Sequence, residues 1–183
     1  MKVLVTGSSN GIGLQIAKGL SNLKYELVLH YNSMVDNLKK NFGSSHDNIH
    51  YIQADLSNDK GADFLYDETV KKIGMPDAII NNAGIAESSP IEKDINLWAK
   101  EFDKAINVNL KSPAIICKQF ISYKRTQKID KKLRIVNIAS RAAFRGEVED
   151  FISYASSKGG LISLTKTIAR SFGKKDNVLA FSI

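Results

Sequence analysis

Short apolar runs alternate with amphipathic stretches along most of the chain. The apolar runs predict six buried strands, at residues 3–5, 27–29, 50–52, 77–80, 134–138 and 178–181. The stretches between them predict helices over residues 11–23, 34–41, 58–73, 94–123 and 152–172. Because strands and helices alternate, the pattern predicts βαβ units, a parallel sheet and crossovers that place helices on both of its faces.

Two of the predicted helices carry a regular apolar stripe. The residues at helical spacing are Ile12, Ile16, Leu20 and Leu23 in the first, and Ala62, Leu65, Thr69 and Ile73 in the third. The long helical region over 94–123 is expected to break near residues 107–109. We therefore predict the α/β class, with a Rossmann-like doubly wound parallel sheet in three α/β/α layers, as one domain over residues 1–183.

Length and composition narrow the class of protein. A chain of 183 residues suits a single domain, and 43% hydrophobic and 25% charged residues are typical of globular proteins. The one cysteine, Cys117, excludes a disulfide scaffold and is expected to be a buried small hydrophobe. No apolar run approaches the ~20 residues of a membrane span, and no signal peptide is evident. We expect a cytoplasmic protein with no membrane partner.

The net charge of +7 raises nucleic acid as a partner, because phosphate backbones attract basic surfaces. Much of the excess lies in one stretch, residues 124–134, which has no aromatic side chains to stack on bases. A solvated helix end and loop explains that stretch more simply. We therefore expect no nucleic-acid partner.

A glycine-rich loop follows the first predicted strand and opens a helix. Its glycines Gly7, Gly11 and Gly13 have the spacing G-x-x-x-G-x-G. The first can make a tight turn, the second lets the backbone approach a pyrophosphate, and the third lets the helix pack close to the sheet. A simple turn is the alternative. The position between a strand and a helix favours a dinucleotide site, with phosphate at the helix N-terminus.

The end of the second strand bears on the cofactor. An acidic residue there usually binds the ribose 2′-hydroxyl, but this end reads Leu29-His30-Tyr31-Asn32-Ser33. Without a carboxylate, a 2′-phosphate would not be repelled, so NADP(H) is favoured and NAD(H) is possible. Ser9, Asn10, Asn32 and Ser33 could donate hydrogen bonds to a phosphate.

A tyrosine and a lysine share one face of a later helix. Tyr154 and Lys158 are four residues apart, and an ammonium group near a phenol favours the phenolate. Such a phenol can give a proton to a carbonyl oxygen or take it back. Ser140, at the end of the fifth strand, could orient that carbonyl. The alternatives are a surface tyrosine on an ordinary helix and a serine that caps backbone.

The histidines give no sign of a metal site. His30, His46 and His50 lack the spacing of metal ligands, so we expect no bound metal.

Taken together, the motifs resemble the classical short-chain dehydrogenase/reductase family. The matching segments are Thr6-Gly7-x-x-x-Gly11-Ile12-Gly13, Asp55 in Ala54-Asp55-Leu56, Asn81-Asn82-Ala83-Gly84, Asn109 in Asn107-Val108-Asn109-Leu110, Ser140, Tyr154 and Lys158. Their order and approximate spacing agree over essentially the whole chain. The resemblance implies hydride transfer between a nicotinamide cofactor and a carbonyl or alcohol substrate.

The resemblance also assigns roles. Tyr154 is the general acid/base, Lys158 promotes its ionisation and binds the nicotinamide ribose, Ser140 polarises the substrate carbonyl, and Asn109 holds a water in a proton relay. The residues expected at the cofactor are Gly7, Ser9, Asn10, Gly11, Ile12, Gly13, Tyr31, Asn32, Ser33, Asp55, Leu56, Asn82, Ala83, Gly84, Tyr154 and Lys158. A homodimer or homotetramer is expected to pack through the Tyr154 helix and the helical region over 94–123.

Two departures from the family pattern qualify this expectation. The interval from Ser140 to Tyr154 is one residue longer than usual, within the region 146–152. Family members also normally continue past the sixth strand into a substrate-binding segment, which the predicted domain lacks. The alternative is therefore a nucleotide-binding protein with little or no catalysis.

Overall fold

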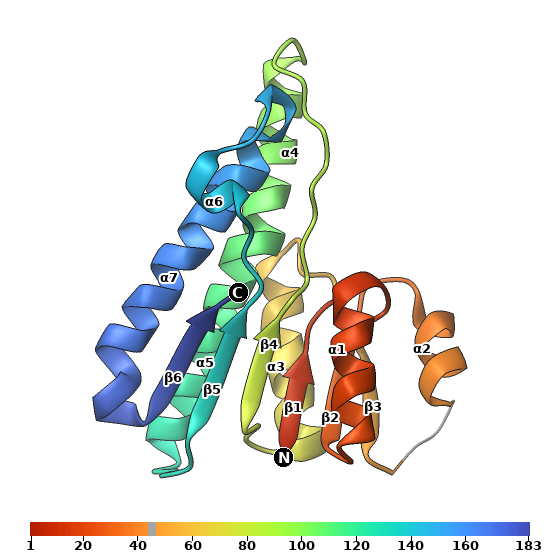
Figure 1. Ribbon diagram of the computed structural model, residues 1–183, viewed down its shortest axis with the longest axis vertical. Coiled ribbons are helices and arrows are strands. Elements are labelled where there is room, and N and C mark those ends of the chain that lie inside the picture. The colour runs from red at the N-terminus through yellow and green to blue at the C-terminus, as the bar shows by residue number, and fades with distance from the viewer. Residues whose placement is uncertain (44–46) are drawn as a thin grey trace.

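A computed structural model describes residues 1–43 and 47–183 and shows a six-stranded parallel sheet (Figure 1). Its strands are β1 Lys2–Val5, β2 Glu26–Tyr31, β3 Ile49–Gln53, β4 Ala78–Asn81, β5 Leu133–Asn137 and β6 Val178–Ser182. The order β3-β2-β1-β4-β5-β6 confirms the doubly wound topology. The chain reverses direction across the sheet between β1 and β4, and ligands of such sheets bind beyond the carboxyl ends of the strands there.

Helices cover both faces of the sheet, as the sequence predicts. They are α1 Gly11–Asn22, α2 Val35–Phe42, α3 Asp59–Ile73, α4 Ile95–Ile106, α5 Ser112–Thr126, α6 Ala142–Arg145 and α7 Ile152–Asp176. On one face, Val3 and Val5 pack in a cluster with residues of α1 and α2. On the other face, Leu4 packs in a cluster with residues of α3, α5 and α7. This alternation along β1 is the two-residue period of a strand that is buried on both sides.

The apolar stripe predicted for α3 is correct, whereas that for α1 is wrong in part. Ala62, Leu65, Thr69 and Ile73 are all buried. In the first predicted helix, however, Ile12 is 63% exposed, Leu23 lies just beyond the end of α1 and is 61% exposed, and the buried residues are Gly13, Leu14 and Ala17. The reason is the contact at Gly13, which lies against the carbonyl of Gly7 and so fixes the rotation of the helix.

The break expected near 107–109 is a π-helical segment, η1 Asn107–Lys111, which joins α4 to α5 without a loop. Between β5 and α7, the sequence did not predict the short helix α6 or the 3-10 segment η2 Glu149–Phe151. Figure 1 shows α4, α6 and the start of α7 extending beyond the carboxyl ends of the strands. These elements build a wall above the sheet edge where the candidate site lies.

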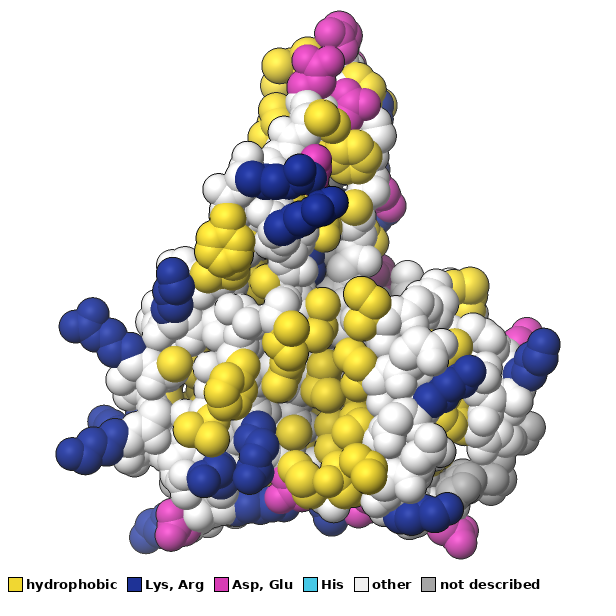
Figure 2. Space-filling model, in the orientation of Figure 1, with side chains coloured by type: hydrophobic (Ala, Val, Ile, Leu, Met, Phe, Trp, Pro, Cys, Tyr) yellow, Lys and Arg dark blue, Asp and Glu magenta, His cyan; other side chains and the backbone are white. Residues whose placement is uncertain are grey.

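One part of the sheet carries exposed apolar side chains. On β6, Val178 and Ala180 face the cluster with α5 and α7, whereas Leu179 and Phe181 are exposed. Figure 2 shows hydrophobic side chains gathered along the centre of this face.

In the part of the chain that the structure describes, no helix is long and apolar enough to cross a membrane. Cys117 is buried as predicted, and burial raises the pKa of its thiol to about 12. Of the three histidines considered as metal ligands, His46 lies outside the described residues.

The packing of Phe120 predicts a large loss of stability on truncation. Phe120 is fully buried, and its ring meets that of Tyr66 edge to face with centroids 5.0 Å apart. We expect Phe120→Ala to lower the free energy of unfolding by about 3–5 kcal/mol, measured by urea denaturation. The matched control is Phe144→Ala, because Phe144 is 78% exposed and its truncation should change stability by less than about 0.5 kcal/mol. Equal losses in the two variants would contradict this account of the core.

Candidate active site

The glycine loop is held in shape by close contacts. Gly7 has a left-handed backbone with φ +63°, and a Cβ there would lie 2.7 Å from Cα of Ala83. A Cβ on Gly13 would lie 2.2 Å from the Gly7 carbonyl oxygen and 2.4 Å from the side chain of Asn82. Gly13 therefore permits close approach, as predicted, but the approach is to the loop and to Asn82 rather than to a strand.

Hydrogen bonds join this loop to the segment after β4. The side-chain amide of Asn82 donates to the carbonyl oxygens of Thr6 and Gly7, at 3.0 and 2.9 Å. The hydroxyl of Thr6 accepts from the backbone N–H groups of Asn82 and Ala83, both at 3.0 Å. These four bonds cross the point where the sheet reverses direction, so they join the two central loops to each other.

A buried histidine connects the same loop to the other strands. Gly7 N–H donates to Nδ1 of His30 at 3.0 Å, and Nε2 of His30 lies 3.0 Å from the carbonyl oxygen of Ala54. Burial lowers the pKa of His30 from 6.5 to about 4, because a charged imidazole would lose its hydration. His30 is therefore neutral at physiological pH.

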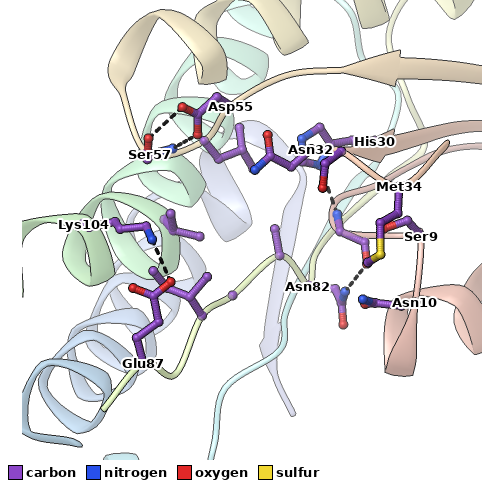
Figure 3. A pocket seen from close by; sticks show the side chains of 17 residues that line it. Ser9, Asn10, His30, Asn32, Met34, Asp55, Ser57, Asn82, Glu87 and Lys104 are labelled. Carbon is purple, nitrogen blue, oxygen red and sulfur yellow. Dashed lines mark hydrogen bonds and ion pairs between the residues drawn. The ribbon is translucent and has the colours of Figure 1, made fainter. Parts of the chain in front are cut away.

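Together these loops enclose a cavity of about 420 Å³ at the carboxyl edge of the sheet (Figure 3). Its lining includes ten of the residues predicted to contact a cofactor: Gly7, Ser9, Asn10, Asn32, Ser33, Asp55, Leu56, Asn82, Ala83 and Gly84. Six other predicted residues lie outside this lining: Gly11, Ile12, Gly13, Tyr31, Tyr154 and Lys158. Tyr31 instead packs against the core cluster on the α1 face.

Several residues line the cavity that were not predicted from the sequence: His30, Met34, Ser57, Ile85, Lys104 and Val108. Only His30 carried a signal, as a polar residue inside an apolar strand. Lys104 on α4 and Val108 on η1 reach the cavity because these two segments run past it, which no local pattern shows. Figure 3 shows Lys104 facing Glu87 at one end of the cavity, where their charged groups are 2.7 Å apart.

Asp55 is fixed at the same end of the cavity. Its carboxylate accepts hydrogen bonds from the backbone N–H and the hydroxyl of Ser57, at 2.9 and 2.8 Å. These bonds favour the ionised form and lower the pKa of Asp55. At the end of β2, Asn32 and Ser33 line the cavity, and neither carries a charge.

Tyr154 and Lys158 share the first turns of α7, next to the end of β5. Lys158 is buried, with 4% exposure, and its Nζ lies 5.8 Å from the centre of the Tyr154 ring. Nζ donates to the carbonyl oxygen of Ile138 at 2.7 Å. Burial lowers the pKa of Lys158 from 10.5 to about 8. The ammonium group therefore lies beside the phenol with no carboxylate partner among the described residues.

Asn109 ties this helix to the cavity wall. From η1, its side-chain oxygen accepts from the N–H of Ile85, and its amide nitrogen donates to the carbonyl of Ile85, both at 2.8 Å. The same nitrogen donates to the hydroxyl of Ser157 at 3.0 Å, and that hydroxyl donates to the Tyr154 carbonyl at 2.7 Å. The structure thus links Asn109 to the residues on either side of the expected reaction centre.

The close packing of α7 on η1 explains a glycine inside a long helix. A Cβ on Gly160 would lie 2.6 Å from the side chain of Leu110.

Ser140 lies at the end of β5, and its hydroxyl oxygen accepts a hydrogen bond from the N–H of Ala142 at 3.2 Å. The hydroxyl therefore caps the start of α6 and keeps its own hydrogen to donate.

Comparisons with known proteins agree with this arrangement. A family model described as short chain dehydrogenase matches residues 1–182. Acetoacetyl-CoA reductase of Acinetobacter sp. (strain RA3849) is 27% identical, over 96% of this chain and 69% of its own length. Glucose 1-dehydrogenase 2 of Bacillus subtilis (strain 168) is 28% identical, over 94% of this chain and 66% of its own length. The chain thus spans about two thirds of the length of these relatives.

A solved structure gives the same result. The structure of 4-hydroxyisoleucine dehydrogenase complexed with NADH has a TM-score of 0.86 and 29% identity, over 99% of this chain and 71% of that one. Fold, motif order and the match over residues 1–182 therefore agree, and the chain belongs to the short-chain dehydrogenase family.

Proposed function

We propose that the protein is an NAD(P)-dependent oxidoreductase that transfers a hydride between a nicotinamide cofactor and a small carbonyl or alcohol substrate. The observation that carries this proposal is the buried Lys158 beside Tyr154, on the same sheet edge as the cavity behind the glycine loop. An ammonium group without a carboxylate partner is costly to bury, and its use at a reaction centre explains why it is there.

The residues present fit a dinucleotide. Gly7, Ser9 and Asn10 line one part of the cavity before the N-terminus of α1, which favours phosphate. Asp55 and Leu56 line another part and would hold the adenosine. When bound, a nicotinamide dinucleotide supplies or accepts the hydride. The family relative whose structure contains NADH supports a cofactor of this class.

Side chains of the protein would supply the proton to the substrate oxygen and take it back in the reverse reaction. In reduction, the Tyr154 hydroxyl would give its proton to the substrate carbonyl oxygen while the Ser140 hydroxyl donates a hydrogen bond to that oxygen. The charge of Lys158 would favour the resulting phenolate. Asn109 would support a proton path from Lys158, and its bonds to Ile85 and Ser157 hold it in place.

NADP(H) is the cofactor that we favour, with NAD(H) as the alternative. Asn32 and Ser33 at the end of β2 give a 2′-phosphate hydrogen-bond donors and no repelling carboxylate. The two cofactors differ only at the 2′ position, so either would use the rest of the cavity in the same way.

The Tyr154→Phe variant tests the proposed chemistry. It removes the proton donor and leaves the cavity intact, so we expect turnover to fall by about a hundredfold or more. The dissociation constant for NADPH should change less than about twofold. Turnover is measured as NADPH oxidation with a panel of small ketones and aldehydes, and binding by calorimetry.

Tyr25→Phe is the matched control, because Tyr25 packs against the core cluster on the α1 face and should leave both quantities unchanged. Carbonyl reduction by Tyr154→Phe at the wild-type rate would refute the assignment. Cofactor binding by the wild type without turnover on any substrate would favour a nucleotide-binding protein with little catalysis.

The Asn32→Asp variant tests the cofactor preference. A carboxylate at the end of β2 would repel a 2′-phosphate and could accept a hydrogen bond from a ribose 2′-hydroxyl. We expect the affinity ratio of NADPH to NADH to fall by about tenfold or more, measured by calorimetric titration. Asn41→Asp adds the same charge on exposed α2 and should leave the ratio unchanged. A ratio unaltered by Asn32→Asp would contradict the preference.

We also propose that the protein forms a homodimer or homotetramer through α5 and α7. A groove of about 350 Å³ lies between these helices, and its lining includes Ile121, Leu164 and Phe172. Light scattering should give the mass of a dimer or tetramer, and Thr167→Glu in this groove should lower it, whereas Gln15→Glu on α1 should not. A monomer at micromolar concentration would contradict the proposal.

The cytoplasmic location stays a prediction from the sequence.

A further inference from the structure

His30 makes more connections around the cavity than its position inside a strand suggests. The side chain is 2% exposed, and each ring nitrogen has a backbone partner. Gly7 can only donate through its N–H, and Ala54 can only accept through its carbonyl. Nδ1 must therefore lack a hydrogen and Nε2 must carry one, so the two contacts fix a single neutral tautomer.

The backbone of His30 holds the next loop residue. The N–H and the hydroxyl of Ser8 both donate to the carbonyl oxygen of His30, each at 2.9 Å. With the bond from Gly7 to the imidazole, three hydrogen bonds connect residues 7 and 8 to this one residue. The side-chain amide of Asn82 donates to the carbonyl oxygen of Gly7, and the imidazole of His30 accepts from the N–H of Gly7. The two side chains therefore bind both polar backbone groups of the residue at this turn.

The second ring nitrogen reaches the other end of the cavity. Ala54 directly precedes Asp55 and Leu56, and its carbonyl belongs to the peptide group whose N–H is that of Asp55. The imidazole therefore bridges the turn at Gly7 and the peptide before Asp55. In Figure 3, His30 lies along the cavity wall between Asp55 and Ser9.

We propose that His30 is a positioning residue for the cofactor, whose side chain sets the separation between the phosphate-binding turn at Gly7 and the adenosine-binding residues after β3. This inference rests on the proposed function, because it assumes that the cavity takes a nicotinamide dinucleotide. A ligand that contacts both ends binds more tightly when their spacing is fixed beforehand. A histidine that served folding alone would change stability without changing the affinity of the folded protein.

Three substitutions separate the two contacts. Asn places its side-chain oxygen where Nδ1 lies and can accept from Gly7, and Gln places its amide nitrogen near Nε2 and can donate to Ala54. Leu fills similar space and makes neither contact. We expect His30→Leu to raise the dissociation constants for NADPH and NADH by about tenfold or more, and His30→Asn and His30→Gln each to restore part of the affinity.

The measurements are calorimetric titration of each folded variant, thermal unfolding without ligand, and hydrogen exchange of the Gly7 amide, which should quicken in His30→Leu and His30→Gln. The KM for the cofactor should rise while kcat at saturating cofactor stays within about twofold, because Tyr154 and Lys158 are untouched. His50→Leu is the matched control, since His50 lies near the start of β3 beside Glu26 and outside the cavity lining.

Each outcome is informative. If the wild type binds the cofactor and folded His30→Leu binds it equally well, the inference is overturned while the proposed function stands. If His30→Leu does not fold, the Asn and Gln variants decide, and wild-type affinity in both overturns the inference. If the wild type binds neither NADPH nor NADH, the proposed function and this inference fail together.

Discussion

The hydrogen bonds at the sheet's central crossover are the constraint on which the site depends. β1 and β4 lie side by side, and their loops leave in opposite directions across the sheet. Thr6 and Asn82 join these loops through four hydrogen bonds, and Gly7 and Gly13 allow the contact because neither carries a Cβ. The segment after β4 continues to Ile85, which is hydrogen-bonded to Asn109. Without this junction, the glycine loop and that segment would not keep their relative positions.

The electrostatics of the site follow from the burial and the hydrogen-bond partners of its titratable groups. Lys158 has a backbone carbonyl rather than a carboxylate as its hydrogen-bond partner, so burial lowers its pKa to about 8. His30 stays neutral because burial lowers the pKa of its imidazole to about 4. Asp55 at the cavity edge remains ionised because Ser57 donates two hydrogen bonds to it. The cationic group thus lies at the proposed reaction centre and the anionic group at the proposed adenosine end.

Much of the fold could be predicted because its signals are local. Apolar runs marked the six strands, and the stripe from Ala62 to Ile73 marked the buried face of α3. The rotation of α1 could not be predicted, because it depends on the contact between Gly13 and the loop. Likewise, Lys104 and Val108 reach the cavity only through the path of α4 and η1, and His30 gains its partners only because β2 lies between β1 and β3. Roles for Ser140, Tyr154 and Lys158 came first from the residue types and their spacing and then from the family resemblance, and they stay predictions.

The central claim is that the cavity behind the glycine loop takes one nicotinamide dinucleotide. Isothermal titration of the wild-type chain with NADPH tests it most directly, with Gly13→Val as the comparison, because a larger side chain would push into the Gly7 carbonyl and Asn82. The account predicts saturable binding of one NADPH per chain in the wild type and at least about tenfold weaker binding in the variant. Absence of saturable binding of NADPH and NADH to the folded wild type would contradict it.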